Sequence, residues 1–376
     1  MLIGIPKEIK VEEYRVGLTP DSVRQYVSHG HKVLIQKNAG IGLGCSDEHY
    51  VKAGAQITDE ARNIFGEADM IIKVKEPQPE ERAMLRLGQI LFTYLHLAPD
   101  PEQTSDLLKS GATCIAYETV TNQHGHLPLL APMSQVAGRL SIQAGARCLE
   151  KDLGGRGILL GGVPGVAPAK VSVLGGGVVG EHAIIMALGL GAEVTVLDNN
   201  VETLERLEIR YGVGLKTVYS SPTAIEDYVA GSDLVIGAVL VPGAEAPKLV
   251  SAELVAQMQK GSVLVDVAID QGGCFETSKA TTHKDPTYLI DGVVHYCVAN
   301  MPGAVPCTST FALNNVTTPF GLSIADQGWQ EALKNDPHLR NGLNISEGQI
   351  TNKAVAAALN QAFVEPKTVL GISFSE

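Results

Sequence analysis

The chain has few cysteines, no long apolar run and a deficit of positive charge. Its six cysteines include no C-x-x-C pair and no metal-type spacing, so we expect reduced thiols in a cytoplasmic protein. No stretch approaches the roughly 18 uninterrupted apolar residues of a membrane span, and the start, MLIGIPKE, lacks the pattern of a signal peptide. The formal net charge of −12 argues against nucleic acid or an anionic membrane as a partner.

Glycine and apolar residues are plentiful. The chain holds 40 glycines and is 45% hydrophobic, which suits an α/β enzyme with many buried strands. At 376 residues it is too long for one ordinary domain, so we expect two.

A glycine motif is the most informative part of the chain. The apolar run Lys170–Leu174 predicts a buried parallel strand, and Ala183–Leu190 predicts a packed helix. Between them, Gly175, Gly177 and Gly180 form G-x-G-x-x-G. In a dinucleotide site the first glycine permits the tight turn, the second lets the backbone approach a pyrophosphate, and the third lets helix and strand pack closely. The alternative to a dinucleotide site is a glycine-rich turn in an α/β protein that binds no dinucleotide.

An acid after the next strand favours NAD. Asp198 closes the predicted strand Glu193–Leu197, 21 residues after Gly177, where a carboxylate accepts hydrogen bonds from the adenosine ribose. Because a carboxylate repels a 2′-phosphate, and Arg206 lies well into the following helix, we expect NAD rather than NADP.

Two series of strands alternate with helical stretches. The first series is predicted at Leu2–Ile5, Lys32–Gln36, Met70–Lys75, Ile90–Leu97 and Thr113–Glu118. The helices between them are predicted at Pro20–His29, Asp47–Ala53, Pro79–Leu87 and Pro101–Ser110. The second series is predicted at Lys170–Leu174, Glu193–Leu197, Leu215–Tyr219, Leu234–Ala238, Val263–Val267 and Val293–Val298. Such alternation is typical of doubly wound parallel sheets.

The order of these segments predicts how the domains are arranged. Pro132–Asp152 is a helical stretch between the two series, and after Pro306 the tail Thr308–Phe363 is predicted to be helical. We therefore expect an α/β fold of two doubly wound domains. A Rossmann domain (131–305) is inserted in a split substrate domain (1–130 and 306–376), which the C-terminal helices close.

Polar side chains cluster where predicted strands end, the edge at which open α/β sheets bind ligands. Lys73 and Lys75 end one strand, and Tyr94 and His96 end the next, each pair on one face by the period of two. In the second series, Asp270 and Asn300 follow the fifth and sixth strands, and all these groups could converge on a nicotinamide between the domains.

Each candidate also has a structural interpretation. Lysines at strand ends are mostly solvated, a strand-end histidine is often only hydrogen-bonded, and Asp270 could stabilise a glycine turn. Arg15 could be an ordinary surface arginine. His124 and His126 resemble metal ligands, but a loop is favoured because no suitably spaced partner flanks them.

Several segments together resemble the alanine dehydrogenase/nicotinamide nucleotide transhydrogenase family. They are GIPKEIKVEEYRVGLTP, DMIIKVKEP, LFTYLHLA, GILLGGVPGVAPAKVSVLGGGVVG and VDVAIDQGG. The resemblance runs from residue 1 to about 370, and the length and the substrate residues favour the alanine dehydrogenase branch. It implies reversible, NAD-dependent oxidation of L-alanine to pyruvate and ammonia.

The resemblance also implies roles for individual residues. His96 and Asp270 would be the acid/base residues, and the substrate would contact Arg15, Lys75, Tyr94, Met133 and Asn300. The NAD site would comprise Ser134, Gly175, Gly177, Val178, Val179, Gly180, Asp198, Ser220, Val239, Leu240, Val267, Ala268, Ile269, Asp270, Val298, Asn300 and Met301.

The residue types suit this chemistry. Deprotonation of the amine, addition of water to the imine and release of ammonia need a group that exchanges protons near neutral pH, as histidine does. Arg15 can hold a carboxylate through two hydrogen bonds, and Lys75 can polarise a carbonyl oxygen. Asp270 would orient amine and water or share proton transfer with His96, and the sequence leaves this division open.

Some family features differ or have no pattern in this chain. Related enzymes place an acid and a histidine on the first C-terminal helix as metal ligands, where this chain has Ser323 and Gln327, so we predict no metal. A homohexamer is expected from the resemblance alone. Two other functions are considered: a transhydrogenase subunit with a membrane partner, and an NAD(H)-binding regulator without turnover. Arg15, Lys75 and His96 together favour a small carboxylate substrate over a second nucleotide, and the full set of polar strand-end residues is more than a regulator that only binds NAD(H) needs.

Overall fold

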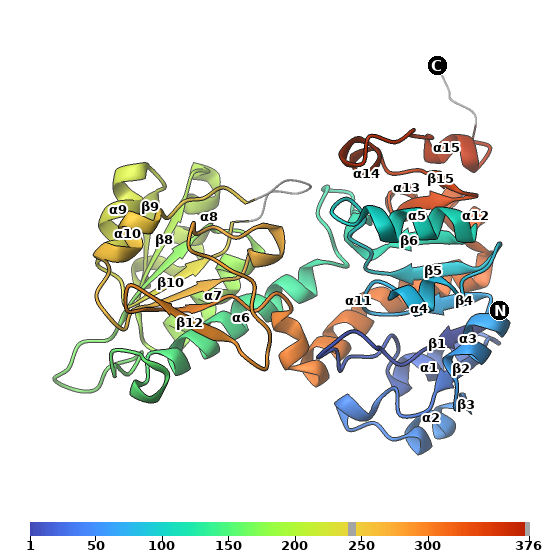
Figure 1. Cartoon of the computed structure of the whole chain (residues 1–376), viewed down its shortest axis with the longest axis horizontal. Helices are drawn as coiled ribbons and strands as arrows, with labels where there is room; N and C mark the ends of the chain where they lie inside the picture. The colour runs from blue at the N-terminus through green and yellow to red at the C-terminus, as the bar shows by residue number, and fades with distance from the viewer. Residues whose placement is uncertain (240–245, 373–376) are drawn as a thin grey trace. The chain divides into compact units, whose positions relative to one another are not determined.

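The computed structural model describes residues 1–239 and 246–372, and it divides into two compact units. Unit 1 comprises Met1–Pro132 and Val305–Glu376, and unit 2 comprises Met133–Ala304. Figure 1 shows each unit as a sheet with helices on both faces. Leu240, which the sequence assigned to the cofactor site, lies outside the described residues.

Unit 1 is built on an eight-stranded sheet in the order β15-β14-β6-β5-β4-β1-β2-β3. Its parallel strands are β1 (Leu2–Ile5), β2 (Lys32–Gln36), β3 (Gln56–Thr58), β4 (Met70–Ile72), β5 (Ile90–Thr93) and β6 (Thr113–Ala116). Numbered within the unit, they run 3-2-1-4-5-6, the order of a doubly wound sheet. The predicted α/β class is confirmed, although β3 had not been recognised.

The sheet of unit 1 is flanked by helices from both ends of the chain. They are α1 (Pro20–Ser28), α2 (Asp47–Ala53), α3 (Ala61–Glu67), α4 (Pro79–Arg82), α5 (Pro101–Ser110), α11 (Pro306–Gln327), α12 (Trp329–Asn335), α13 (Pro337–Arg340), α14 (Lys353–Ala358) and α15 (Pro366–Val369). The N-termini of α1 and α5 are capped by Thr19 and Asp100, each followed by proline in the first turn. The cap and the proline together fix the residue at which each helix begins.

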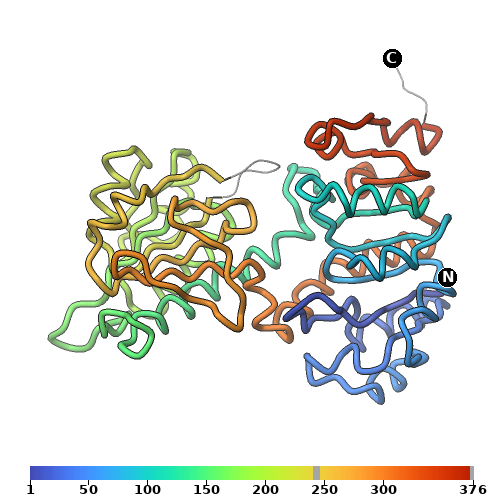
Figure 2. Tube along the Cα trace, in the orientation of Figure 1, coloured from blue at the N-terminus to red at the C-terminus, as the bar shows by residue number. Residues whose placement is uncertain are grey.

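The prediction of an all-helical tail was wrong in one place. Strands β14 (Leu343–Ser346) and β15 (Gln349–Ile350) form an antiparallel hairpin, and β14 pairs with β6. The turn is Glu347-Gly348, both at positive φ, as a tight hairpin requires. Figure 2 shows this C-terminal segment beside the segment around β6, far from it in sequence. Pairing with β6 buries Leu343 and Ile345. The gain from burying these side chains outweighs the helical tendency predicted for this part of the tail.

Unit 2 is built on a seven-stranded sheet in the order β12-β13-β11-β10-β7-β8-β9. Its strands are β7 (Lys170–Leu174), β8 (Glu193–Asp198), β9 (Leu215–Tyr219), β10 (Leu234–Gly237), β11 (Val263–Asp266), β12 (Thr287–Ile290) and β13 (Val293–Tyr296). Without β12, the parallel strands again run 3-2-1-4-5-6. The edge strand β12, antiparallel to β13, is partly exposed and had not been predicted.

Five α-helices accompany the sheet of unit 2 in the described part of the chain. They are α6 (Ala131–Cys148), α7 (Val178–Gly189), α8 (Val201–Tyr211), α9 (Pro222–Ala230) and α10 (Ala252–Gln257). The first two residues of α6 belong to unit 1, so this helix carries the chain from one unit into the other. No helix in the described residues has the length and apolar character that crossing a membrane requires.

Candidate active site

The three glycines of the motif occupy three different environments. Gly175 adopts φ 97°, a left-handed conformation that disfavours a side chain. Gly177 is the N-cap of α7, and a Cβ there would meet no atom within 4 Å. A Cβ on Gly180 would lie 1.8 Å from the carbonyl oxygen of Gly175. The open space at Gly177 and the free N–H groups of the α7 N-terminus form a cradle that fits a pyrophosphate.

Asp198 lies at the carboxyl end of β8, directly against the glycine loop. Its Oδ2 accepts a hydrogen bond from the Gly176 N–H at 2.7 Å, and its Oδ1 accepts one from Asn200 N–H at 2.8 Å. Both oxygens keep lone pairs, so the carboxylate can also accept ribose hydroxyls. The residues present therefore fit a nicotinamide dinucleotide.

Arg206 lies closer to the loop than its position in the sequence suggested. Its guanidinium donates to the Gly176 carbonyl at 3.1 Å and to Glu181 Oε2 at 2.5 Å. Arg210 donates to the other oxygen of Glu181. Arg206 is thus paired with the Glu181 carboxylate, so its guanidinium is not free to bind the 2′-phosphate of NADP.

The other predicted cofactor residues lie mainly where strands or helices of unit 2 meet their loops. Val178 and Val179 form the first turn of α7, whereas Met133 and Ser134 lie in the first turn of α6. Several follow the carboxyl ends of strands β9, β10, β11 and β13, namely Ser220, Val239, Val267, Ala268 and Val298. This is the edge at which open α/β sheets bind ligands.

Asp270 lies on a short 3₁₀ turn, Ile269–Gln271, and its side chain is exposed. The loop around it is held by the buried carboxylate of Asp266, which accepts hydrogen bonds from Cys274 N–H at 2.8 Å and Ser278 Oγ–H at 2.5 Å. Burial raises the pKa of Asp266, and these hydrogen bonds oppose the increase. Asp266 therefore fixes the loop that presents Asp270.

Asn300 and Met301 follow β13 after a short connection. The Asn300 carbonyl accepts a hydrogen bond from His283 Nε2 at 2.8 Å, which fixes the backbone at this position. Met301 begins a 3₁₀ turn, Met301–Ala304, and is buried.

The two lysines after β4 differ sharply. Strand β4 ends at Ile72, earlier than predicted, so the expected alternation does not place Lys73 and Lys75 on one face. Lys73 is fully buried, with its Nζ 2.8 Å from Glu8 Oε2 and 2.7 Å from Glu81 Oε1. Burial lowers the pKa of Lys73, but these two carboxylates outweigh it and the pKa rises. Lys73 is a structural residue.

Lys75 has no such partners. Its ammonium makes no hydrogen bond or ion pair with any described residue. Burial lowers the pKa of Lys75, Glu76 opposes the decrease, and the positive charge of Arg15 adds to it. Its backbone is set by Glu8, whose Oε1 accepts the N–H of Val74 at 2.6 Å and of Lys75 at 3.3 Å. Lys75 is therefore a partly desolvated cation on a fixed backbone.

Arg15 is buried, which excludes the interpretation as a surface arginine. Its Nε donates to Glu13 Oε1 at 2.7 Å and an Nη to Glu13 Oε2 at 2.6 Å, a two-pronged pair that fixes the guanidinium plane. Burial lowers the pKa of Arg15, but the hydrogen bonds and the negative charge of Glu13 outweigh this effect. The pKa therefore rises above its ordinary value and the guanidinium stays charged.

His96 lies just beyond β5, which ends at Thr93. Its ring is exposed and stacks on the Tyr94 ring, with centroids 5.9 Å apart and planes at 11°. The Tyr94 hydroxyl donates to the Leu129 carbonyl at 2.5 Å, and burial raises the pKa of that phenol. Arg15 is within electrostatic reach of both Tyr94 and Lys75, so these three predicted substrate residues of unit 1 lie near one another, and His96 stacks on Tyr94.

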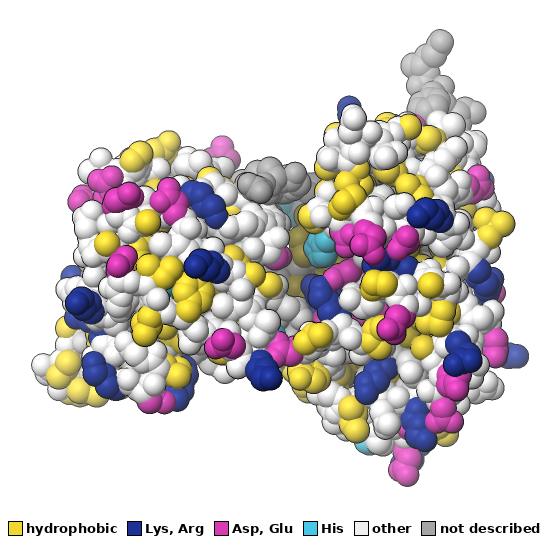
Figure 3. Space-filling view, viewed as in Figure 1, with side chains coloured by type: hydrophobic (Ala, Val, Ile, Leu, Met, Phe, Trp, Pro, Cys, Tyr) yellow, Lys and Arg dark blue, Asp and Glu magenta, His cyan; other side chains and the backbone are white. Residues whose placement is uncertain are grey.

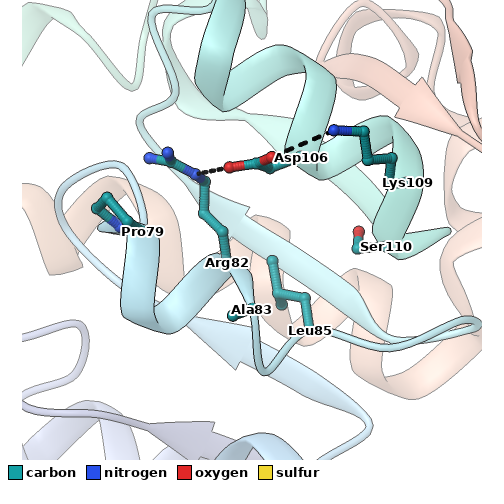
Figure 4. Close-up of a pocket in the computed structure, with 7 residues that line it drawn as sticks. All are labelled: Pro79, Arg82, Ala83, Leu85, Asp106, Lys109 and Ser110. Carbon is teal, nitrogen blue, oxygen red and sulfur yellow. Dashed lines mark hydrogen bonds and ion pairs between the residues drawn. The ribbon is translucent and has the colours of Figure 1, made fainter.

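A surface pocket elsewhere in unit 1 contains none of the predicted site residues. The pocket, of about 380 Å³, is lined by Pro79, Arg82, Ala83, Leu85, Asp106, Lys109 and Ser110. In Figure 4, Arg82 and Lys109 both point toward Asp106, at 2.9 and 3.8 Å, so the charges lining this pocket are opposed. On the face visible in Figure 3, basic and acidic side chains are interspersed over each unit.

The residues considered as metal ligands make hydrogen bonds within the protein. His124 and His126 donate their backbone N–H groups to Asn122 in a turn, which supports the loop interpretation. Gln327 donates to Ser323 Oγ at 3.0 Å. Among the residues that the structure describes, no group of three histidine, cysteine or acidic side chains is placed to hold a metal ion.

Family models match both parts of the chain. The alanine dehydrogenase/PNT N-terminal domain matches residues 4–137, and the C-terminal domain of the same family matches residues 141–353. The chain belongs to the alanine dehydrogenase/PNT family.

Individual members of the alanine dehydrogenase/PNT family are similar over nearly the whole chain. An alanine dehydrogenase of Halomonas elongata is 60% identical, covering 99% of this chain and 100% of its own. That of Bacillus subtilis is 54% identical, covering 98% of each. A solved L-alanine dehydrogenase superposes with a TM-score of 0.93 at 54% identity, covering 96% of this chain and 99% of its own. A transhydrogenase from Sinorhizobium meliloti superposes with 0.80 at 25% identity, covering 94% and 100%.

Sequence reasoning missed the carboxylates that hold these candidate residues. Glu8, Glu13, Glu118 and Asp266 accept hydrogen bonds from candidate residues or from their loops. Glu118 was visible only as the last residue of a predicted strand, and Glu13 only as an acid near Arg15. For Glu118 and Asp266 the available signal was an acid at or just after the end of a strand.

Proposed function

We propose that this protein is an NAD-dependent L-alanine dehydrogenase. The reaction is the reversible conversion of L-alanine, NAD⁺ and water to pyruvate, ammonium, NADH and a proton. The observation that carries the proposal is 60% identity to an alanine dehydrogenase over 99% of the chain. The transhydrogenase alternative is less supported, because the solved transhydrogenase is only 25% identical, against 54% for the solved alanine dehydrogenase.

Unit 2 is proposed to bind NAD through the cradle of the glycine loop and Asp198. The N–H groups at the start of α7 bind the pyrophosphate, Gly177 leaves room for it, and the Asp198 carboxylate accepts the ribose hydroxyls. When bound, NAD⁺ supplies a hydride acceptor for the substrate Cα. The predicted domain limits, 131–305 for NAD and 1–130 with 306–376 for substrate, form part of this proposal.

Unit 1 is proposed to bind the substrate. Arg15, fixed by Glu13, binds the carboxylate, and Lys75 stabilises negative charge on the carbonyl or carbinolamine oxygen. His96 takes and returns the protons of the amine and of the attacking water. Tyr94 supports the His96 ring by stacking.

In unit 2, Asp270, Met133 and Asn300 are proposed to complete the substrate contacts. Asp270 either orients the amine and the water or shares proton transfer with His96. These roles rest on the residue types and on their positions at strand ends and on α6.

We further propose that the protein works in the cytoplasm as a homohexamer without a resident metal. The cysteines, which are free in the described residues, support a reducing compartment such as the cytoplasm. The homohexamer rests on the family resemblance, and the lack of a resident metal rests on Ser323 and Gln327 at the positions where related enzymes place metal ligands.

One assay tests the proposed function. Purified protein is given NADH and pyruvate, with and without ammonium, and NADH oxidation is followed. We expect turnover that requires ammonium and yields L-alanine. Turnover without ammonium would contradict the alanine assignment, and NADH binding without any turnover would favour the regulator.

A further inference from the structure

The backbone at His96 adopts a left-handed conformation. Its φ is 50°, which residues other than glycine rarely adopt and which costs energy unless the surroundings enforce it. The neighbours Leu95 and Leu97 are buried, whereas the His96 side chain is exposed. The chain thus uses a disfavoured backbone conformation at the residue proposed to move protons.

One carboxylate binds the backbone at this position. Glu118 Oε1 accepts the His96 N–H at 2.7 Å, and Leu95 N–H lies 3.2 Å from each of its two oxygens. Two consecutive N–H groups that point at one anion form the concave arrangement that binds anions in proteins. Here the anion is a side chain of the same chain.

The position of Glu118 follows from the sheet. Glu118 lies in the 3₁₀ turn Tyr117–Thr119, directly after β6, and β6 is the parallel neighbour of β5 with Thr93 opposite Ala116. The carboxyl ends of two adjacent strands therefore bring the acid and the His96 turn together. Since the ring stacks on Tyr94, the imidazole is fixed from the backbone side by Glu118 and from the ring side by Tyr94.

We propose that Glu118 is a positioning residue for the reaction: its carboxylate holds the Leu95–His96 backbone so that the imidazole is presented in one orientation. The inference rests on the proposed function and extends it. Glu118 does not touch the reacting atoms; it acts through His96. Loss of the carboxylate removes acceptors from two N–H groups and releases the strained turn, so the imidazole samples other orientations.

The test compares Glu118→Gln with Glu118→Asp in the full-length protein. The carboxamide offers one acceptor and turns an NH₂ group toward the second N–H, so we expect kcat to fall on the order of 10²-fold, with a smaller change in KM for pyruvate. The dissociation constant for NADH and the Tm stay near those of the wild type. Glu118→Asp keeps the charge, and its kcat lies between those of Glu118→Gln and the wild type. Glu60→Gln, an exposed surface acid, is the matched control.

Three results overturn the inference. They are a kcat of Glu118→Gln within threefold of the wild type, a loss of kcat matched by an equal loss of NADH-binding protein, and a Glu118→Asp kcat no higher than that of Glu118→Gln. If Glu118→Gln does not fold, the comparison of Glu118→Asp with the wild type decides by the same criteria. A wild type without ammonium-dependent turnover instead removes the proposed function, and the inference with it.

Discussion

Only Val74 separates Lys73 from Lys75, yet the two lysines have opposite electrostatic environments. Lys73 is buried between Glu8 and Glu81, which raise its pKa above the ordinary value. Lys75 loses solvent without gaining an ion pair, and its pKa falls. The first arrangement keeps an ammonium charged inside the protein, and the second produces a cation that loses its proton at a lower pH than an exposed lysine does.

This difference predicts a pH dependence. The pKa of Lys75 lies below 10.5, and the proposed role needs the charged form, so kcat/KM for pyruvate should fall as pH rises through the lowered pKa. Lys75→Arg keeps its charge at high pH, so we expect lower activity with the basic limb shifted upward. Initial rates measured across pH at saturating NADH provide the check. A basic limb of the wild type at or above 10.5 would contradict the proposed role of Lys75.

Asp198 predicts a change in cofactor preference. Asp198→Ala removes the carboxylate that binds the Gly176 N–H and repels a 2′-phosphate. We expect weaker NADH binding and a smaller preference for NAD over NADP, measured as the ratio of their kcat/KM values. Asp59→Ala, at an exposed acid paired with Lys37, is the control. An unchanged ratio would show that Asp198 does not read the ribose.

At the scale of elements, the junction of β7 and α7 combines two requirements that glycine meets for different reasons. Gly180 lets the helix pack against the preceding turn, because a Cβ would lie 1.8 Å from the Gly175 carbonyl oxygen. A Cβ on Gly177 would meet no atom within 4 Å, so this glycine leaves space beside the helix N-terminus. The first requirement concerns folding, and the second concerns the ligand.

The two glycines therefore predict different outcomes on substitution by alanine. Gly180→Ala forces helix and strand apart, so we expect a clear fall in Tm together with weaker NADH binding. Gly177 has φ −69°, which alanine adopts readily, so Gly177→Ala should leave the Tm nearly unchanged and weaken NADH binding alone. Thermal unfolding and NADH titration of both variants decide. Equal effects on the Tm would contradict this separation of roles.

The hairpin β14–β15 gives a stability prediction for unit 1. Ile345 is fully buried in the core that includes Leu91, Leu107 and Cys114. Ile345→Ala should destabilise the protein by about 2–5 kcal/mol, because a cavity remains in the core. Urea unfolding measures this change, while NADH affinity at low urea stays constant. A change below about 0.5 kcal/mol, the usual range for surface positions, would contradict the packing described.

Most central strands could be predicted from sequence, whereas three of the four edge strands, β3, β12 and β15, were missed and only the edge strand β9 was predicted. β1, β5, β7 and β10 are mostly apolar and are buried along nearly their whole length, so composition indicates them. β3, β12 and β15 have only two to four residues and are partly exposed, so their own composition is a weak signal and their formation depends on pairing with a neighbouring strand. The same limit applies to the site, because Glu8 binds the Val74 N–H 66 residues away.

At the scale of the whole molecule, both units repeat the strand order 3-2-1-4-5-6, and unit 2 is one continuous segment. The helix Ala131–Cys148 and the turn Met301–Ala304 mark where the chain enters and leaves it. Each unit has its own buried core, as the clusters around Leu91 and Leu264 show. A unit with its own core and continuous chain can fold alone.

Unit 2 therefore predicts a functional fragment. Residues 133–304 expressed alone should fold and bind NADH, and should catalyse no reaction with pyruvate and ammonium, because Arg15, Lys75 and His96 are absent. Circular dichroism and NADH titration provide the measurement. A folded fragment that does not bind NADH would contradict the assignment of the cofactor to this unit.

The helix α12 begins with Trp329, the sole tryptophan of the chain, and lies in unit 1. Tryptophan emission therefore reports on one unit only, while unit 2 contributes none. An unfolding transition followed by tryptophan fluorescence describes unit 1, and the fluorescence of NADH bound as proposed describes unit 2. Trp329 emission and the fluorescence of bound NADH thus report on different units. The unfolding of unit 1 and of unit 2 can therefore be followed separately in one sample.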